Sequence, residues 1–242
     1  LTGSIGFLFS DNGTAIGNEI VTKKDSPPGI VFHAVVNGTA IGNRIVTSGA
    51  NAEGIRFVDT DNAIASGNEI TTTGTGATGI VFDASSGVLA SGNRISTGGE
   101  DAHGIHFAAS ANGIASGNSV ETMGDDAYGI YFENSADGTA SGNSIRTSGS
   151  NGAALLFEGS SSGTASNNDI MTAGPSGLGI HFLDSDGGAA TNNRITTFGS
   201  IGIGILASNS DGGTIDGNTI STAGILAGGI VFAAADSWTA AG

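Results

Sequence analysis

The sequence is poor in several residue types, and each shortage excludes a class of protein. The 242-residue chain has no cysteine, so a disulfide scaffold and a cysteine-ligated metal site are both excluded. Only 7 lysine and arginine residues stand against 22 acidic residues, and the formal net charge of −15 argues against nucleic acid as a partner. The longest apolar run, 223–235, is shorter than the ~18 residues that a membrane-spanning helix needs.

What the chain does have is a repeat of 25 residues that recurs without insertion or deletion. An asparagine recurs every 25 residues. Isoleucine or valine stands two positions after it, and threonine stands two positions after that. A second block reads Gly-Ile-x-Phe, and a third column is alanine. The asparagine column consists of Asn18, Asn43, Asn68, Asn93, Asn118, Asn143, Asn168, Asn193 and Asn218.

The period within each block predicts β-strands. Repeated and variable positions alternate in Asn-x-Ile-x-Thr and in Ile-x-Phe, as they do in half-buried strands. One unit is too short to bury its own apolar face, but stacked units can bury it together. We therefore predict an all-β fold: a right-handed parallel β-helix of about ten coils, forming a single domain over residues 1–242. The Ile and Phe columns would form its core, and the asparagines would form a hydrogen-bonded ladder.

One coil departs from this pattern. Ala207 stands where nine other coils have phenylalanine. Phe198, Ile201 and Ile203 are bulky residues that are new in the neighbourhood, so we predict that they refill the space that the missing ring leaves.

The repeat resembles known bacterial sequences. Units of the type Gly-Ile-x-Phe…Ala-Ser-Gly-Asn-x-Ile-x-Thr are similar to the parallel β-helix repeats of bacterial secreted and cell-surface proteins. These include autotransporter passengers, large adhesins, phage tailspikes, and polysaccharide lyases and epimerases. The resemblance covers the whole chain and implies an extracellular or cell-surface location. It does not choose among these functions, because the repeat encodes architecture rather than chemistry.

Acidic residues that lie 25 positions apart are expected to stack on consecutive coils. Carboxylates at a spacing of about 4.8 Å repel one another unless they are solvated, protonated or bridged by a cation. Calcium prefers such oxygen ligands, so weak Ca²⁺ binding is one hypothesis and a solvated acidic turn is the alternative. The candidate ligands form two clusters, which are Asp186, Asp211 and Asp236, and Glu100, Asp101, Asp125 and Asp126.

Two outward faces are candidates for ligand binding. Tyr131 is expected to face outward beside His106 of the preceding coil, and this pair is the best candidate for stacking on a glycan. A second, flat face carries small hydroxyl side chains and resembles the ice-binding planes of some solenoid antifreeze proteins. Its alternative is a face that packs on another protein or tolerates small residues. This flat face consists of Ser116, Thr139, Ser141, Thr164 and Ser166.

Uniform coils and scattered arginines favour a non-catalytic structural or adhesive rod: a stalk, an adhesin segment or a filament subunit. The alternative is a polysaccharide-binding or polysaccharide-processing β-helix, and an ice-binding protein is a weaker one. The chain starts at Leu1 and stops inside a coil, so we expect a piece of a longer solenoid or copies that stack end to end. A surface glycan or protein is the other expected partner, and apart from Ca²⁺ no cofactor is expected.

Overall fold

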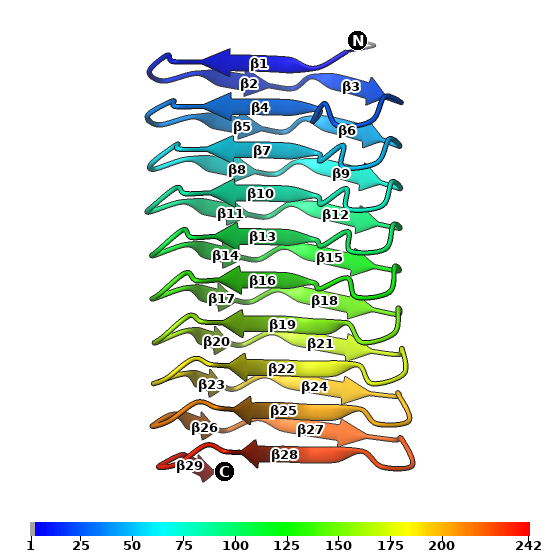
Figure 1. Cartoon of the computed structure of the whole chain (residues 1–242), viewed down its shortest axis with the longest axis vertical. Helices are drawn as coiled ribbons and strands as arrows, with labels where there is room; N and C mark the ends of the chain where they lie inside the picture. Colours follow the sequence, from blue (N-terminus) through cyan, green and yellow to red (C-terminus); the bar gives the residue numbers. More distant parts are fainter. Residues whose placement is uncertain (1–2) are drawn as a thin grey trace.

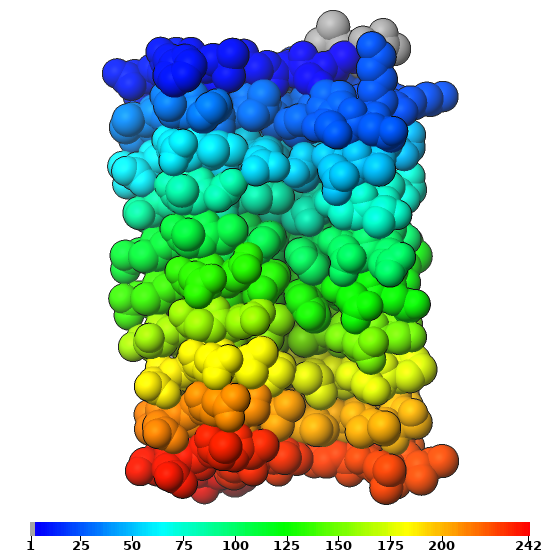
Figure 2. Space-filling model, in the orientation of Figure 1, coloured from blue at the N-terminus to red at the C-terminus, as the bar shows by residue number. Residues whose placement is uncertain are grey.

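Each 25-residue repeat forms one coil of the structure. The structure is a computed structural model that describes residues 3–242, and it contains three parallel sheets that run along one long axis (Figure 1). Sheets 1 and 2 have ten strands each, and sheet 3 has nine. Figure 2 shows the coils as flat layers stacked from the N-terminal end to the C-terminal end. Residues 3–242 contain no helix that is long and apolar enough to cross a membrane.

Every coil contributes one strand to each sheet until the chain ends. Sheet 1 consists of β1 (Ile5–Leu8), β4 (Ile30–His33), β7 (Ile55–Val58), β10 (Ile80–Asp83), β13 (Ile105–Ala108), β16 (Ile130–Glu133), β19 (Ala153–Glu158), β22 (Leu178–Leu183), β25 (Ile203–Ser208) and β28 (Gly228–Ala233). Sheet 2 consists of β2 (Thr14–Ile16), β5 (Thr39–Ile41), β8 (Ile64–Ser66), β11 (Leu89–Ser91), β14 (Ile114–Ser116), β17 (Thr139–Ser141), β20 (Thr164–Ser166), β23 (Ala189–Thr191), β26 (Thr214–Asp216) and β29 (Thr239–Ala241). Sheet 3 consists of β3 (Glu19–Thr22), β6 (Arg44–Thr47), β9 (Glu69–Thr72), β12 (Arg94–Thr97), β15 (Ser119–Thr122), β18 (Ser144–Thr147), β21 (Asp169–Thr172), β24 (Arg194–Thr197) and β27 (Thr219–Thr222).

The register of these sheets is the repeat itself. Strands pair in parallel, and each residue lies beside the residue 25 positions later, as in Ile105↔Ile130 and Phe107↔Phe132. The predicted parallel β-helix of about ten coils is therefore confirmed. Because the register never slips, every sequence column becomes a straight line of side chains along the axis.

The core is a stack of phenylalanine rings flanked by aliphatic columns. From Phe7 to Phe182, the rings of consecutive coils stack with centroids 4.5–5.1 Å apart. The isoleucines and alanines of the other columns are buried beside them, so the core is one continuous cluster. Burial of this apolar surface is the main stabilising contribution to the fold.

The space at Ala207 is filled from the last coil, and the prediction that nearby residues refill it is wrong. Phe198 and Ile201 lie at the surface, with about half of each side chain exposed. Trp238 packs against the core instead, with its ring 5.4 Å from Phe182. Its indole N–H donates a hydrogen bond to the carbonyl of Ser210 at 2.5 Å.

The predicted asparagine ladder is present and is buried. The side-chain oxygen of Asn118 accepts hydrogen bonds from both the backbone N–H and the Nδ2 of Asn93, each at 3.0 Å. The Nδ2 of Asn93 also donates to the carbonyl of Ala65 at 2.9 Å. The amide side chains thus provide partners for backbone groups at a turn where the sheets do not reach.

A second ladder follows sheet 1 and was not predicted. In this column the backbone N–H of each residue donates to the hydroxyl of the next coil, as from Ser110 to Ser135 at 2.8 Å. The Ser135 hydroxyl in turn donates to a backbone carbonyl, that of Glu133 at 2.9 Å or that of Phe107 at 3.0 Å. The ladder consists of Thr60, Ser85, Ser110, Ser135, Ser160, Ser185 and Ser210.

Replacing one rung of the asparagine ladder should destabilise the whole solenoid. In Asn118→Ala the buried N–H of Asn93 loses its acceptor, so the free energy of unfolding should fall by about 1–3 kcal/mol. Urea denaturation followed by circular dichroism measures the change. Thr164→Ala, on the outer face of sheet 2, is the control and should change stability by less than about 0.5 kcal/mol. Equal losses in the two variants would contradict the role of the ladder.

Candidate functional site

Side chains suited to proton transfer gather on the outer face of sheet 1. Strand residues alternate in direction, so Ile130 and Phe132 enter the core while Tyr131 and Glu133 point outward. The same alternation on neighbouring coils brings the outward residues into one band that follows the long axis. We call this band the sheet 1 strip; it consists of Glu53, Arg56, Asp83, His103, His106, Tyr128, Tyr131, Glu133, Glu158, His181 and Ser208.

Four rings form a two-by-two block in the middle of the strip. His106 stacks on Tyr131 with centroids 4.6 Å apart and planes 4° from parallel. His103 stacks on Tyr128 at 4.9 Å, and the two stacks meet edge to face. The structure therefore brings the predicted pair together, while Tyr131 is only 8% exposed. Glycan binding by this pair stays a prediction, and a sugar would meet ring edges rather than an open ring face.

His106 and Tyr131, which stack on each other, each contact a carboxyl group of the next coil. The Nε2 of His106 lies 3.0 Å from the Oε2 of Glu133. The hydroxyl of Tyr131 donates to the Oε2 of Glu158 at 2.5 Å. Both contacts join residues 27 positions apart, so each dyad spans one step of the solenoid. This repetition places two acid–base pairs side by side on one face.

Arginine is present in the strip but is fully engaged. The Nη1 of Arg56 lies 2.9 Å from Glu53, and its Nη2 lies 2.9 Å from Asp83. Two carboxylates therefore neutralise one guanidinium, and the strip as a whole is acidic. A ligand that depends on a free cation finds none at Arg56.

Burial moves the pKa values of the rings away from neutral pH. It lowers the pKa of His103 to about 3, with a further lowering from His106, and it lowers the pKa of His181 to about 4. Burial also raises the pKa of Tyr131, and its hydrogen bond to Glu158 raises it further. At neutral pH these imidazoles are neutral and this phenol keeps its proton. The pattern of neutral bases beside a protonated acid is typical of sites that move protons.

The acidic columns serve as acceptors for the backbone of the next coil. The carboxylate of Asp186 accepts from the N–H of Asp211 at 2.8 Å, and that of Asp211 accepts from the N–H of Asp236 at 2.7 Å. Asp125 accepts in the same way from the N–H of Ser150 at 2.7 Å. The remaining candidates lie at a turn of the coil; these are Glu100, Asp101 and Asp126. Calcium binding at either cluster stays a prediction.

The flat face forms two ranks on the outside of sheet 2. Thr139 pairs with Thr164, and Ser141 pairs with Ser116 on one side and with Ser166 on the other. Apolar side chains interrupt the ranks elsewhere on this sheet; the side chain of Ile16, for example, is 62% exposed. Binding of ice or of a protein to this face stays a prediction.

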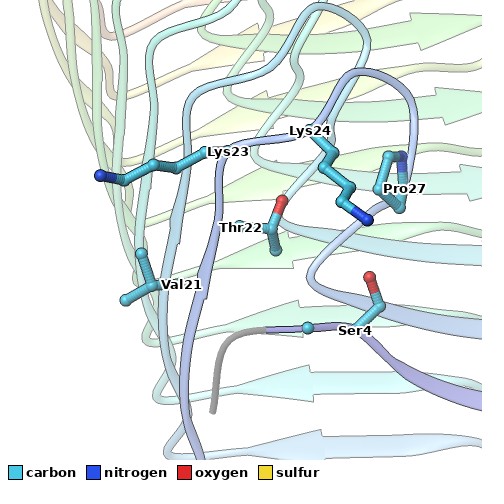
Figure 3. Close-up of a pocket in the computed structure, with 7 residues that line it drawn as sticks. Ser4, Val21, Thr22, Lys23, Lys24 and Pro27 are labelled. Carbon is cyan, nitrogen blue, oxygen red and sulfur yellow. The ribbon is translucent and has the colours of Figure 1, made fainter.

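A hollow of about 440 Å³ lies at the first coil. Lys24 points toward Ser4 and Pro27 in this hollow, whereas Lys23 points away (Figure 3). Among the residues that the structure describes, its lining holds two lysines and no acidic residue, and the sheet 1 strip begins two coils further along. The hollow therefore has no part in the chemistry of the strip.

Comparison with known proteins gives a family for most of the chain. Residues 36–227 match the family described as "Periplasmic copper-binding protein (NosD)". No curated protein sequence matches the chain significantly. The description supports a location outside the cytoplasm, which is the coarser part of the prediction from the sequence.

Several solved structures share the fold at low sequence identity. DFA-IIIase from Arthrobacter chlorophenolicus A6, solved without its lid, has a TM-score of 0.58 and 10% identity over 84% of this chain and 65% of its own. Vag8, in its complex with C1 inhibitor, has a TM-score of 0.60 and 16% identity over 99% of this chain and 70% of its own. The A-module of the mannuronan C-5 epimerase AlgE6 from Azotobacter vinelandii has a TM-score of 0.51 and 14% identity over 100% of this chain and 80% of its own.

These matches correct the prediction about the function of the chain. The prediction of a non-catalytic rod, and with it the prediction that the chain is not an enzyme, is wrong on this comparison, because the similar structures are mostly carbohydrate-active enzymes and tailspikes. The chain spans less than two thirds of the length of the DFA-IIIase chain that was solved without its lid. At these identities the likeness shows the fold alone.

The titration of His103 should make stability depend on pH. Its pKa of about 3 lies below the ordinary value of 6.5, so the unfolded chain binds more protons between these values and stability falls as the pH drops from 6.5 toward 3. The Nδ1 of His103 accepts a hydrogen bond from the N–H of Tyr128, which requires the neutral ring. His103→Phe keeps a stacked ring without a titrating group, so its urea midpoint should depend less on pH. Identical pH dependence in both proteins would contradict the assignment.

Proposed function

The chain belongs to the NosD family, described as periplasmic copper-binding proteins, and we propose that the sheet 1 strip binds and processes a polysaccharide. The observation that carries this proposal is the pair of dyads, His106 with Glu133 and Tyr131 with Glu158, side by side on one face. Carboxylate, imidazole and phenol are the groups that enzymes position for general acid–base chemistry. The strip presents all three along the axis of the solenoid, where an extended polymer can follow the coils.

The donor groups of this chain do not fit a resident copper ion. Copper sites in proteins are built from histidine, cysteine and methionine, and the sequence has no cysteine. The Nδ1 of His103, the Nε2 of His106 and the Nε2 of His181 each contact a protein partner. Within residues 3–242, no three histidine, cysteine or acidic side chains come together in a way that could hold a metal ion. The proposed function therefore makes no use of copper.

Apolar side chains beside the dyads offer a surface for the nonpolar face of a sugar ring. Tyr131, Ala153 and Leu156 form a buried cluster on the outer side of sheet 1. Leu178 and Leu183 pack against this cluster and remain partly exposed. Saccharide sites combine such apolar surface with a few polar groups that set orientation, and here Leu178 and Leu183 supply the first beside the polar groups of the strip.

The similar structures support the same reading. The structure of DFA-IIIase in complex with DFA-III matches this chain with a TM-score of 0.57, and AlgE6 is a mannuronan epimerase. Vag8 shows that a similar fold binds a protein partner, C1 inhibitor. For this chain, a protein partner, end-to-end stacking of copies and a position on the cell surface all stay predictions.

Loss of the Tyr131 hydroxyl should reduce polysaccharide processing while leaving the fold unchanged. Tyr131→Phe keeps the ring stack on His106 but removes the donor to Glu158. We expect a fall in turnover of about 100-fold, because the carboxyl group of Glu158 loses the donor that fixes its orientation. The assay follows new reducing ends and unsaturated products over a panel of neutral and acidic polysaccharides. Ser141→Ala, on sheet 2, is the control; equal activity of wild type and Tyr131→Phe would contradict the assignment.

Copper should not bind this chain as a resident cofactor. Protein purified after growth with copper, dialysed, and analysed by inductively coupled plasma mass spectrometry should contain far less than one copper per chain. A stoichiometric copper that His103→Phe releases would overturn this expectation and would make the histidines of the strip ligands.

A further inference from the structure

The strip holds two carboxylates at matching positions of adjacent strands. Glu133 ends β16 and Glu158 ends β19, and the two residues are direct partners in the parallel register. Neighbouring strands are about 4.8 Å apart, so the two carboxyl groups leave the same face about one strand spacing from each other. Retaining glycosidases use two carboxyl groups about 5–5.5 Å apart, whereas inverting enzymes need a wider gap for a water molecule.

Both carboxyl groups are reachable, and each is held by only one of its oxygens. The Glu133 side chain is 40% exposed, and Glu158 is partly exposed. The Oε2 atoms bond to His106 and Tyr131, and within residues 3–242 neither Oε1 has a protein partner. Each acid therefore has a fixed orientation and one free oxygen, which is the arrangement that a positioned reactant requires.

The two partners give the acids different roles. Tyr131 keeps its proton at neutral pH because burial and its hydrogen bond raise its pKa, so its hydroxyl donates and the Oε2 of Glu158 accepts. His106 is different, because burial lowers its pKa below the ordinary value even though Glu133 acts in the opposite direction. The Nε2 of His106 lies 3.0 Å from the Oε2 of Glu133, so an imidazole is the group that holds this acid. Glu158 thus accepts from a phenol, whereas Glu133 is paired with an imidazole, a group that enzymes use in general acid–base chemistry.

The charges of the strip select the class of substrate. Glu53, Asp83, Glu133 and Glu158 are acidic, and the only arginine of the strip, Arg56, is engaged by the first two. No cation of the strip is left for the carboxylates of a uronic acid polymer, and the carboxylates present would repel it. Neutral sugars avoid this repulsion, and carboxylates accept hydrogen bonds from their hydroxyl groups.

We propose that the strip is the active site of a retaining glycoside hydrolase for neutral polysaccharides, with Glu158 as the nucleophile and Glu133 as the acid–base residue. The inference rests on the proposed function and goes beyond it by naming the reaction, the residues and the substrate class. His106 and Tyr131 act as positioning residues, because they hold the two carboxyl groups without touching the anomeric carbon.

The reaction balances with water alone. The carboxylate of Glu158 attacks the anomeric carbon, the glycosidic C–O bond breaks, and the proton of Glu133 passes to the departing oxygen. A glycosyl ester of Glu158 results. In the second step the oxygen of a water molecule attacks the same carbon while Glu133 takes a proton from that water. The ester bond breaks, and both acids return to their starting states. Two displacements at one carbon retain its configuration.

The test compares three Glu→Gln variants of the full chain. Wild type, Glu133→Gln, Glu158→Gln and the control Glu121→Gln, which lies in β15 of sheet 3, are assayed on inulin, levan, arabinan and β-glucan and on alginate and polygalacturonate. We expect wild type to release reducing ends from a neutral polymer with retained configuration by proton NMR. Each site variant should lose at least about 100-fold in kcat, and the control should not. Thermal melts of all four proteins check folding.

Azide separates the two roles. In Glu133→Gln, azide should replace water in the second displacement and yield a glycosyl azide of retained configuration. Glu158→Gln should give no such product. Inverted products, full activity of either site variant, or unsaturated products from the acidic polymers alone would overturn the inference while leaving polysaccharide processing in place. Absence of any product and of any binding to all six polymers, the latter measured by affinity electrophoresis, would overturn the proposed function as well.

Discussion

The register of one coil on the next is the constraint on which the rest of the structure depends. Because every strand pairs with its equivalent 25 residues away, a residue type that recurs in the sequence becomes a continuous line in space. Phenylalanine then gives a stack of rings, asparagine gives a chain of shared amides, and serine gives a chain of hydroxyls. Each ladder supplies partners for backbone groups at the turns, so the same register buries apolar surface and satisfies polar atoms.

The sheet 1 strip arises where the outward columns of this register stop being uniform. Strands β13 and β16 bring the rings of His106 and Tyr131 to the outer face, and β16 and β19 bring the acids Glu133 and Glu158. Rings that stack on adjacent coils shield one another from water, so the imidazoles stay neutral and the phenol stays protonated. The same step of the solenoid brings each ring to a carboxylate two columns away. The groups suited to acid–base chemistry therefore occur where the outward columns of the solenoid depart from the repeat.

Much of the fold was predictable from the sequence, because an exact repeat converts spacing directly into geometry. The core columns, the asparagine ladder and the contact of Tyr131 with His106 follow from positions alone. The role of Trp238 did not follow from its position, because it fills a space left in a different coil and depends on side-chain volume. The dyads with Glu133 and Glu158 were also missed, although both lie in one visible column. Their contacts run diagonally between columns, and only side-chain length and rotamer decide them.

The most direct test of the account is to map where a neutral oligosaccharide binds. A methyl and amide NMR titration of the 23.5 kDa chain with fructo-oligosaccharides reports every coil at once. We expect shifts confined to sheet 1 around β13, β16, β19 and β22, including the methyl groups of Leu156 and Leu178. Shifts centred on the outer face of sheet 2 or sheet 3, with sheet 1 unchanged, would contradict it.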